Sequence, residues 1–241
     1  MNVSIMQPYF FPYIGYFQLI AVSDVFVLHD DVQYIKGGWV NRNRILFNGE
    51  SRMITLPVQK DAHELPINAR RYIADKQARK DIINLIKQAY PRAPFFQLIF
   101  SFLIELLMFE DKNVAHFNEN LIRRITDYLG LSCKIITSSC MDKNNDLKGE
   151  RRVLEICKQL GATSYINLIG GTELYHHESF RQHEISLHFL EAKNECYEQL
   201  GKTWVPFLSI IDVLMFNSVE EIRRLLTQHR LFAPPQIEVK H

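Results

Sequence analysis

Side chains that can act as acids, bases or hydrogen-bond donors gather within the first 45 residues of the chain. Gln7 follows one short apolar run, and Asp30 and Asp31 follow a second. Adjacent carboxylates can bind a divalent cation, or one of them can take a proton from a substrate. We predict Asp31 as a catalytic base, with Gln7 and Asn41 orienting the substrate or a developing oxyanion. The alternative is structural, because an aspartate here can also cap a turn or pair with a nearby arginine.

Arginine and aromatic side chains in residues 34–44 suit a nucleotide-linked sugar. Guanidinium groups bind phosphate oxygens through paired hydrogen bonds, and aromatic rings stack on bases and sugars. In an extended segment, Arg42 and Arg44 share one side, and the asparagines at 41 and 43 share the other. We expect one arginine in the site and the other on a solvated face. The binding residues predicted for the N-terminal region are Tyr9, Asp30, Gln33, Trp39, Arg42 and Arg44.

Two later segments contain further candidates for substrate binding. Ser138 and Ser139 follow one predicted strand, while Tyr165, Asn167 and Gly170 lie where another strand ends and its loop begins. Glycine permits a ligand to approach the backbone closely, but it equally suits a turn with positive φ. Serine pairs are common in any sequence. The histidines at 176, 177 and 183 fit no usual zinc spacing, so we predict no metal site.

The N-terminal candidates require strands that end where the polar residues begin. Apolar runs at residues 2–6 and 25–29 predict short buried strands. Between them, a helix is predicted with Ile14, Phe17 and Ala21 on one face. Ligands of such strand-loop-helix-strand units bind at the carboxyl ends of the strands, where the predicted site residues follow.

The middle of the chain predicts a hairpin and then helices. Asn48-Gly49 separates residues 44–47 from 53–57, and this dipeptide is the strongest short-range signal for a hairpin turn. Three helices are expected within residues 75–129, and the last of them stops at Gly130.

Beyond Gly130, strands and helices alternate. Residues 133–137, 164–166 and 185–190 predict strands, and residues 149–160 predict a helix. Such alternation implies a mostly parallel sheet with right-handed crossovers. The fold class expected is therefore α/β, with a Rossmann-like sheet, helices on both faces and a helical insertion. We predict a single domain over residues 1–241.

The N-terminal motifs also resemble a known family. Residues 4–20, 29–34 and 39–44 resemble the WbqC-like protein family, and the resemblance covers nearly the whole chain. Genes of this family accompany bacterial O-antigen clusters, so the resemblance implies a role in surface-polysaccharide assembly. Residues 197–199 and 208–214 match the family's late motifs.

A second resemblance concerns the loop after the first strand. Residues 12–16, Pro-Tyr-Ile-Gly-Tyr, are similar in position to the H-x-G-H loop of nucleotidyltransferases, with tyrosines in place of both histidines. The resemblance implies a nucleotidyltransferase-like sheet. In that superfamily the histidines stabilise phosphates during attack on ATP, so their replacement argues against adenylyl transfer. The Ser138-Ser139 pair and Arg151-Arg152 are similar to the second phosphate-binding segment of the same folds.

The overall composition is that of an ordinary globular protein. The chain has 241 residues, is 47% hydrophobic and carries a formal net charge of +1, which provides no field to hold a nucleic acid or an anionic membrane. Its four cysteines form no C-x-x-C pair. No signal peptide is evident, and the apolar residues 95–109 fall short of a membrane span. We expect a cytoplasmic protein with neither a membrane span nor a nucleic-acid partner, and the sequence allows a homo-oligomer.

These observations predict an enzyme that transfers an acyl or aminoacyl group to the amine of a nucleotide-linked amino sugar. Asp31 would take the amine proton, and Arg42 would hold the diphosphate. The acyl donor is not defined by the sequence; ATP could activate an amino acid as an acyl-adenylate.

Two other functions fit the same residues. A metal-dependent glycosyltransferase would use Asp30 and Asp31 to bind magnesium or manganese. A non-catalytic member of a glycan-assembly complex would instead present Phe10, Phe11 and Tyr16 as a partner surface. Burial of those rings would remove the main support for the second alternative.

Overall fold

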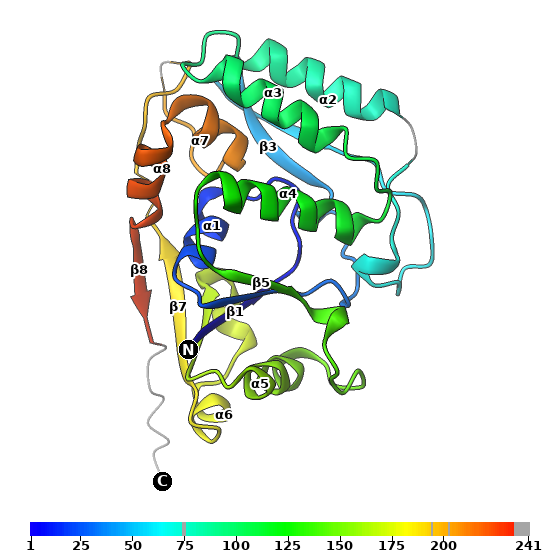
Figure 1. Ribbon diagram of the computed structural model, residues 1–241, viewed down its shortest axis with the longest axis vertical. Coiled ribbons are helices and arrows are strands. Elements are labelled where there is room, and N and C mark those ends of the chain that lie inside the picture. Colours follow the sequence, from blue (N-terminus) through cyan, green and yellow to red (C-terminus); the bar gives the residue numbers. More distant parts are fainter. Residues whose placement is uncertain (74–75, 194, 202, 234–241) are drawn as a thin grey trace.

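A mostly parallel sheet forms the centre of the molecule. The computed structural model describes residues 1–241 except 74–75, 194, 202 and 234–241. Within the described residues, six strands pair in the order β5-β2-β1-β6-β7-β8 (Figure 1). The strands are β1 (Asn2–Met6), β2 (Val25–Leu28), β5 (Lys134–Thr137), β6 (Ser164–Leu168), β7 (Ser186–Ala192) and β8 (His229–Phe232). All neighbours run parallel except β7 and β8, so the predicted Rossmann-like α/β class is confirmed.

The strand order is that of a doubly wound fold. Counting only the parallel strands in chain order, the sheet reads 3-2-1-4-5, and the order reverses between β1 and β6. In open α/β sheets, ligands bind beyond the carboxyl ends of the strands at such a switch point. The loop after β1, which carries Gln7 and Tyr9, therefore begins at the place where a ligand is expected.

Side chains alternate between two hydrophobic clusters, one on each face of the sheet. Val3 and Ile5 belong to the cluster that contains α5 and α6, whereas Phe26 and Leu28 belong to the other. Figure 1 shows α5 and α6 below the sheet and α2, α3 and α4 above it. The helices are α1 (Ile14–Ala21), α2 (Lys76–Ala89), α3 (Phe96–Leu107), α4 (Val114–Tyr128), α5 (Gly149–Leu160), α6 (His177–Arg181), α7 (Ile210–Phe216) and α8 (Val219–Leu226), with short 3-10 helices η1 (Ile67–Ala69), η2 (Ser138–Cys140) and η3 (Ile169–Leu174).

Helix α1 differs from its predicted orientation. The sequence predicts an inward face of Ile14, Phe17 and Ala21, but Ala21 is exposed and Ile14 is only half-buried. Every residue from Gly15 to Ile20 is buried, because α1 packs between the sheet and α8 and has almost no solvent face. A helix buried all round carries no amphipathic pattern to read.

The predicted hairpin is present, and its first strand contains residues of the N-terminal candidate site. β3 (Arg42–Phe47) pairs antiparallel with β4 (Glu50–Thr55) as a separate two-stranded sheet. Asn48 and Gly49 have φ values of 52° and 80°, as a two-residue turn with positive φ requires. β3 begins two residues earlier than predicted, so it includes both arginines of the candidate site.

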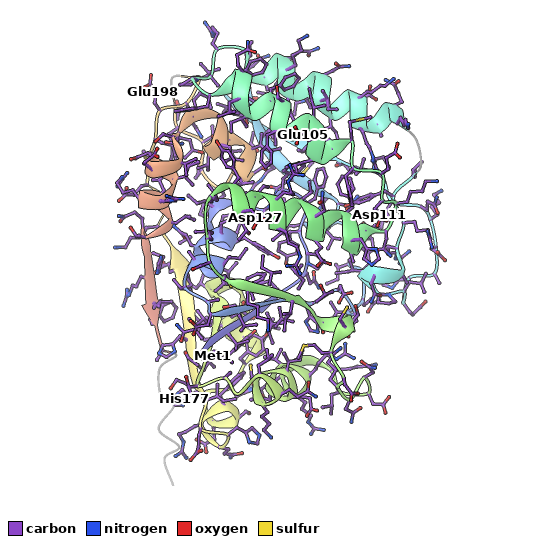
Figure 2. All side chains as sticks on the ribbon, in the orientation of Figure 1. Met1, Glu105, Asp111, Asp127, His177 and Glu198 are labelled. Carbon is purple, nitrogen blue, oxygen red and sulfur yellow. The ribbon has the colours of Figure 1, made fainter. Side chains whose placement is uncertain are left out.

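Figure 2 shows Glu105 on α3 and Asp127 on α4 in the upper half of the view, and Met1 and His177 in the lower half. No helix in the described part of the chain is long and apolar enough to cross a membrane.

Candidate functional site

Buried polar side chains fix the shape of the loop after β1. Phe11 has a φ of 43°, a backbone conformation that a non-glycine residue adopts only when its surroundings enforce it. Four side chains donate hydrogen bonds to the backbone carbonyls of this loop. Tyr16 Oη donates to Gln7 (3.0 Å), and Asn118 Nδ2 donates to Pro8 (2.8 Å). Asn43 Nδ2 donates to Phe10 (3.1 Å) and Phe11 (2.7 Å), and Ser209 Oγ also donates to Phe11 (2.8 Å). Because the donors come from α1, α4, β3 and the start of α7, the whole fold holds this loop in one shape.

An aromatic cavity of about 160 Å³ lies against this loop. Its walls are Tyr9, Pro12, Tyr13, Trp39, Asn43, Arg44 and Phe207. The rings of Tyr13 and Phe207 lie 6.4 Å apart between centroids, and Trp39 and Phe207 are 38% and 51% exposed. A mostly apolar cavity with a few polar groups is typical of small-molecule sites, and sites for drug-sized ligands measure about 300–1,000 Å³. This cavity is therefore sized for a single ring.

The two tyrosines of the nucleotidyltransferase-like loop have different environments. Tyr13 is the N-cap residue of α1 and lines the cavity, whereas Tyr16 is fully buried. A Cβ atom at Gly15 would lie 2.4 Å from the Tyr13 ring, so the glycine makes room for that ring. Burial raises the pKa of Tyr9, and burial together with the charge of an ionised Tyr9 raises the pKa of Tyr13 to about 12. Both cavity hydroxyls are therefore neutral at pH 7.

Only one of the two predicted arginines lines the cavity. Arg44 does, and its guanidinium carbon lies 5.3 Å from the centroid of the Trp39 ring. Arg42 instead donates from Nε to the Gly38 carbonyl (3.1 Å) and from Nη2 to the Gly37 carbonyl. The structure thus brings Tyr9, Trp39 and Arg44 together and leaves Arg42 outside the cavity wall.

Asn41 is not among the residues that line the cavity. It is 8% exposed, accepts a hydrogen bond from Tyr34 Oη (2.9 Å) and donates one to the Leu56 carbonyl (3.0 Å). These two bonds attach the residue before β3 to Tyr34 and to Leu56. The oxygen and the nitrogen of the Asn41 amide, which the sequence assigns to substrate orientation, are thus both bonded within the protein.

Asp30 joins the ends of β2 and β5. It is 2% exposed and accepts hydrogen bonds from Ser139 N (2.9 Å), Ser139 Oγ (2.6 Å) and Asn68 Nδ2 (3.2 Å). Ser138 is also buried, and its Oγ has no hydrogen-bond partner in the described structure. Asp30, Ser138 and Ser139 are therefore neighbours, as the sequence predicts.

Asp31 belongs to a mostly buried group of charged and polar side chains. Its Oδ2 lies 2.7 Å from Lys143 Nζ, and its Oδ1 lies 3.7 Å from both Arg152 Nη1 and His29 Nε2. Burial alone would raise the pKa of Asp31, but the hydrogen bond and charge of Lys143 bring it below the ordinary value. Asp31 is therefore ionised at neutral pH. Its Oδ1 is buried.

His29 stays neutral beside this carboxylate. Burial lowers the pKa of His29 to about 4, the charges of Arg152 and Lys143 act in the same direction, and the charge of Asp31 opposes them. Arg152 uses its other donors on backbone carbonyls, from Nε to Leu147 (2.7 Å) and from Nη2 to Asn145 (2.6 Å). Arg152 therefore fastens the segment before α5 to the end of β2.

Gln7 directly follows β1, whose end lies next to the end of β2, the strand that precedes Asp31. The His29 N–H donates to the Met6 carbonyl (2.8 Å), so the residues after β1 and β2 are adjacent. Gln7 is half-buried, and its side-chain amide makes no hydrogen bond to the described residues. Gln33 is exposed and lies farther along the loop, where its Nε2 is 2.9 Å from His63 Nδ1.

The candidates in β6, Tyr165 and Asn167, lie on the other face of the sheet. Tyr165 is fully buried in the cluster with α5 and α6, and its ring stacks on Phe180 at 5.3 Å. Asn167 Nδ2 donates to Tyr165 Oη (3.0 Å). Gly170 lies in η3, with open space where a side chain would be. These three residues are thus not part of the aromatic cavity.

Several residues of the site are not predicted from the sequence as site residues. Tyr13 had a signal, its position in the nucleotidyltransferase-like loop, and His29 had one as the first residue of the family-like segment 29–34. Asn43 lines the cavity beside Arg44, although the alternation places the two side chains on opposite sides. Phe207 and Lys143 had no local motif, because they meet Tyr13 and Asp31 across more than a hundred residues of chain.

Contacts within the site also bear on the two alternative functions. No group of three or more histidine, cysteine, aspartate or glutamate side chains suited to a metal occurs in the described part of the chain. Asp30 and Asp31 instead face donors from the protein itself. Phe10, Phe11 and Tyr16 are each 0% exposed, so the partner surface proposed for a non-catalytic role loses its main support.

The fold and the cavity define an α/β protein of Rossmann-like topology whose candidate site is formed by the loop after the first strand. The sequence pattern of the WbqC-like protein family matches residues 7–224, and the chain belongs to this family. It is 30% identical over 218 residues to the uncharacterized protein Rv1507c of Mycobacterium tuberculosis, covering 90% of this chain and 93% of that protein. No solved structure matches the chain. All seven cavity residues lie within the matched region.

Proposed function

We propose that the protein is a cytoplasmic enzyme of bacterial surface-polysaccharide assembly, which transfers an acyl or aminoacyl group to the amine of a nucleotide-linked amino sugar. One observation carries the proposal: a preformed aromatic cavity with a single guanidinium at the loop after β1. Aromatic faces pack well against sugar rings, and the doubly wound fold favours a nucleotide at the same edge of the sheet. Membership of the WbqC-like family supports the pathway.

The cavity would hold the sugar, and the nucleotide would extend along the carboxyl ends of the strands. Tyr9 is only three residues beyond Met6, whose carbonyl is bonded to the His29 N–H. Three residues span at most about 11 Å. For a sugar seated against Tyr9, we place the amine on the side of the ring that faces the β2 end, so that it points out of the cavity towards Asp31.

Asp31 has the charge state that a proton acceptor needs. When the sugar amine attacks the acyl carbonyl carbon, a C–N bond forms and the attacking nitrogen becomes strongly acidic. The half-buried carboxylate of Asp31 would take that proton, while Lys143 Nζ, 2.7 Å from Oδ2, holds the carboxylate in place. The bond from the carbonyl carbon to the leaving group then breaks. A carboxylate with a lowered pKa is sufficient here because the proton donor is itself acidic.

The contacts change two of the roles expected from the sequence. Arg44 replaces Arg42 as the arginine of the binding site, since the donors of Arg42 are engaged by the backbone. Gln7 keeps its expected role, because its amide is unengaged, whereas Asn41 acts by positioning β3. The proposal includes no metal ion, and the acyl donor, with or without ATP, is left to experiment.

A thermal-shift screen of nucleotides and nucleotide sugars tests the binding step. Ligand that binds the folded state raises the unfolding free energy by about 2.7 kcal/mol at a concentration of 100 Kd. We expect nucleotide-linked amino sugars to raise the melting temperature more than the free nucleotide or free sugar does. Mass spectrometry of reactions with acyl donors then tests the chemistry. A product that keeps the nucleotide and gains one acyl group is expected, whereas release of the nucleotide would indicate sugar transfer instead.

A further inference from the structure

Arg44 differs from the other shielded arginines of the chain in having no hydrogen-bond partner. Its Nε is buried without an acceptor, and no hydrogen bond or ion pair of its guanidinium group occurs within the described structure. Other buried or half-buried arginines donate to backbone carbonyls, namely Arg42, Arg70, Arg79, Arg123 and Arg152. The unpaired buried Nε is costly, and the rest of the half-buried side chain lines the cavity, where its N–H groups can donate to an acceptor from outside the chain.

The Trp39 ring positions the guanidinium group of Arg44 for such a partner. It lies over Trp39, with 5.3 Å between the guanidinium carbon and the ring centroid. Stacking on an aromatic ring leaves the in-plane N–H groups of arginine free to form paired hydrogen bonds. No carboxylate is among the residues that line the cavity, and its tyrosine hydroxyls are neutral at pH 7. The cavity therefore offers one positive charge in neutral, aromatic surroundings.

We infer that the cavity takes a sugar ring bearing a carboxylate, with Arg44 as the residue that binds the carboxylate and selects acidic sugars. This inference rests on the proposed function and names its substrate class, a nucleotide-linked amino sugar of the uronic acid type. The cavity volume of about 160 Å³ holds the ring but not a nucleotide. A diphosphate must continue outward to its nucleoside, whereas a carboxylate enters with the ring and can meet the guanidinium group of Arg44 in the cavity wall.

Free sugars probe the cavity without the nucleotide. The chain has two tryptophans, so an NMR spectrum of the ¹⁵N-labelled protein contains two indole N–H signals. Trp39 lines the aromatic cavity, and Trp204 lines a neighbouring one. Titrating glucuronate, glucose and glucose 1-phosphate while following the Trp39 signal measures the affinity of each sugar. A Trp39→Phe protein assigns the signal.

Glucuronate should bind at least tenfold more tightly than glucose and more tightly than glucose 1-phosphate. In Arg44→Gln this preference should disappear, because a charge-assisted hydrogen-bond pair is lost. Arg42→Gln is the matched control on the same strand, and the preference should survive in it. The folded state of each variant is checked from the dispersion of the same spectra.

Each other outcome overturns the inference in a distinguishable way. Equal affinity for glucuronate and glucose would show that the cavity does not recognise a carboxylate, but it would leave the proposed function intact. Tighter binding of glucose 1-phosphate, abolished in Arg44→Gln, would assign Arg44 to the diphosphate and again spare the proposed function. If the preference for glucuronate were lost in Arg42→Gln but kept in Arg44→Gln, Arg42 and not Arg44 would be the residue that binds the carboxylate. No shift of the Trp39 signal with any sugar would contradict both the inference and the proposed use of the cavity.

Discussion

The half-buried Asp31 and the buried Asp212 have opposite electrostatic environments. Asp31 faces Lys143, and this contact lowers its pKa despite burial. Asp212 is fully buried and accepts hydrogen bonds from Tyr90 Oη (2.9 Å), Tyr197 Oη (2.6 Å) and Gln199 Nε2 (2.7 Å), but burial outweighs these bonds and raises its pKa. These three donors satisfy a carboxylate that is buried in an otherwise apolar helix.

Asp31→Asn tests the role of a single oxygen in the chemistry. The amide is nearly isosteric but cannot accept the amine proton, so turnover should fall by about 10²- to 10⁴-fold. Sugar binding in the cavity should be retained, because Asp31 does not line it. Steady-state kinetics and circular dichroism at a temperature well below unfolding measure both effects. Near-normal turnover would exclude Asp31 as the base.

The same two aspartates predict opposite trends of stability with pH. An unfolded aspartate has a pKa of about 3.9. Asp31, with a lowered folded pKa, stabilises the fold above that value, and this contribution is lost as the pH falls through the folded pKa. Asp212, with a raised folded pKa, contributes fully below about pH 3.9, and this contribution is lost as the pH rises through its folded pKa.

Urea unfolding between pH 3 and 7 measures these trends. The unfolding free energy of the wild type minus that of Asp31→Asn should grow as the pH rises. The corresponding difference for Asp212→Asn should shrink over the pH range above about 3.9. If both differences changed in the same direction, the contacts assigned to one of the carboxylates would be wrong.

At the scale of elements, the strands, the hairpin and the last helix of the central segment could be predicted because each has a local signal. Asn48-Gly49 determines the hairpin, and Gly130 and Gly161 end helices with φ values of 65° and 66°. The wall of the cavity could not be predicted, because it needs Phe207 beside Tyr13, two residues brought together only by the packing of α7. β8 was also not predicted, since its four residues carry no clear alternation.

Gly15→Ala tests whether the start of α1 shapes the cavity. The added Cβ would lie 2.4 Å from the Tyr13 ring, which must move, so the ligand Kd should rise at least tenfold. Stability should change little, because alanine is otherwise the better helix residue by about 0.5–1 kcal/mol. Gly49→Ala is the matched control. Its φ of 80° strains alanine by about 1–2 kcal/mol, but with open space around it the Kd should not change. An unchanged Kd in Gly15→Ala would contradict the assignment of Tyr13 to the site.

Asn118→Leu tests how strongly α4 holds the loop after β1. The change leaves the carbonyls of Pro8 and Val40 and the hydroxyl of Tyr72 without this partner, so the unfolding free energy should fall by about 2–4 kcal/mol. Asn217→Leu, which loses one bond to the Val213 carbonyl, should lose only about 1 kcal/mol. Denaturant titration measures both, and equal losses would argue against a special role for Asn118.

At the scale of the whole molecule, the parallel sheet was predictable because strand-helix alternation allows few topologies. The site within it was predictable only in part. Tyr9, Trp39 and Arg44 come together as expected, but Tyr165 and Asn167 face the opposite hydrophobic cluster. Residues at the ends of neighbouring strands share an edge of the sheet, whereas the face on which a side chain lies depends on the register of each strand. A shift of one residue moves a side chain from one layer to the other.

The most direct test of the proposed function is a calorimetric titration with a nucleotide-linked amino sugar. Wild-type protein should bind it, and Trp39→Ala should raise the Kd at least tenfold, because the variant loses one wall of the cavity and the ring that supports Arg44. Leu174→Ala, at a side chain 63% exposed on η3, should leave the Kd unchanged. Equal Kd values for wild type and Trp39→Ala would contradict the claim that the aromatic cavity is the substrate site.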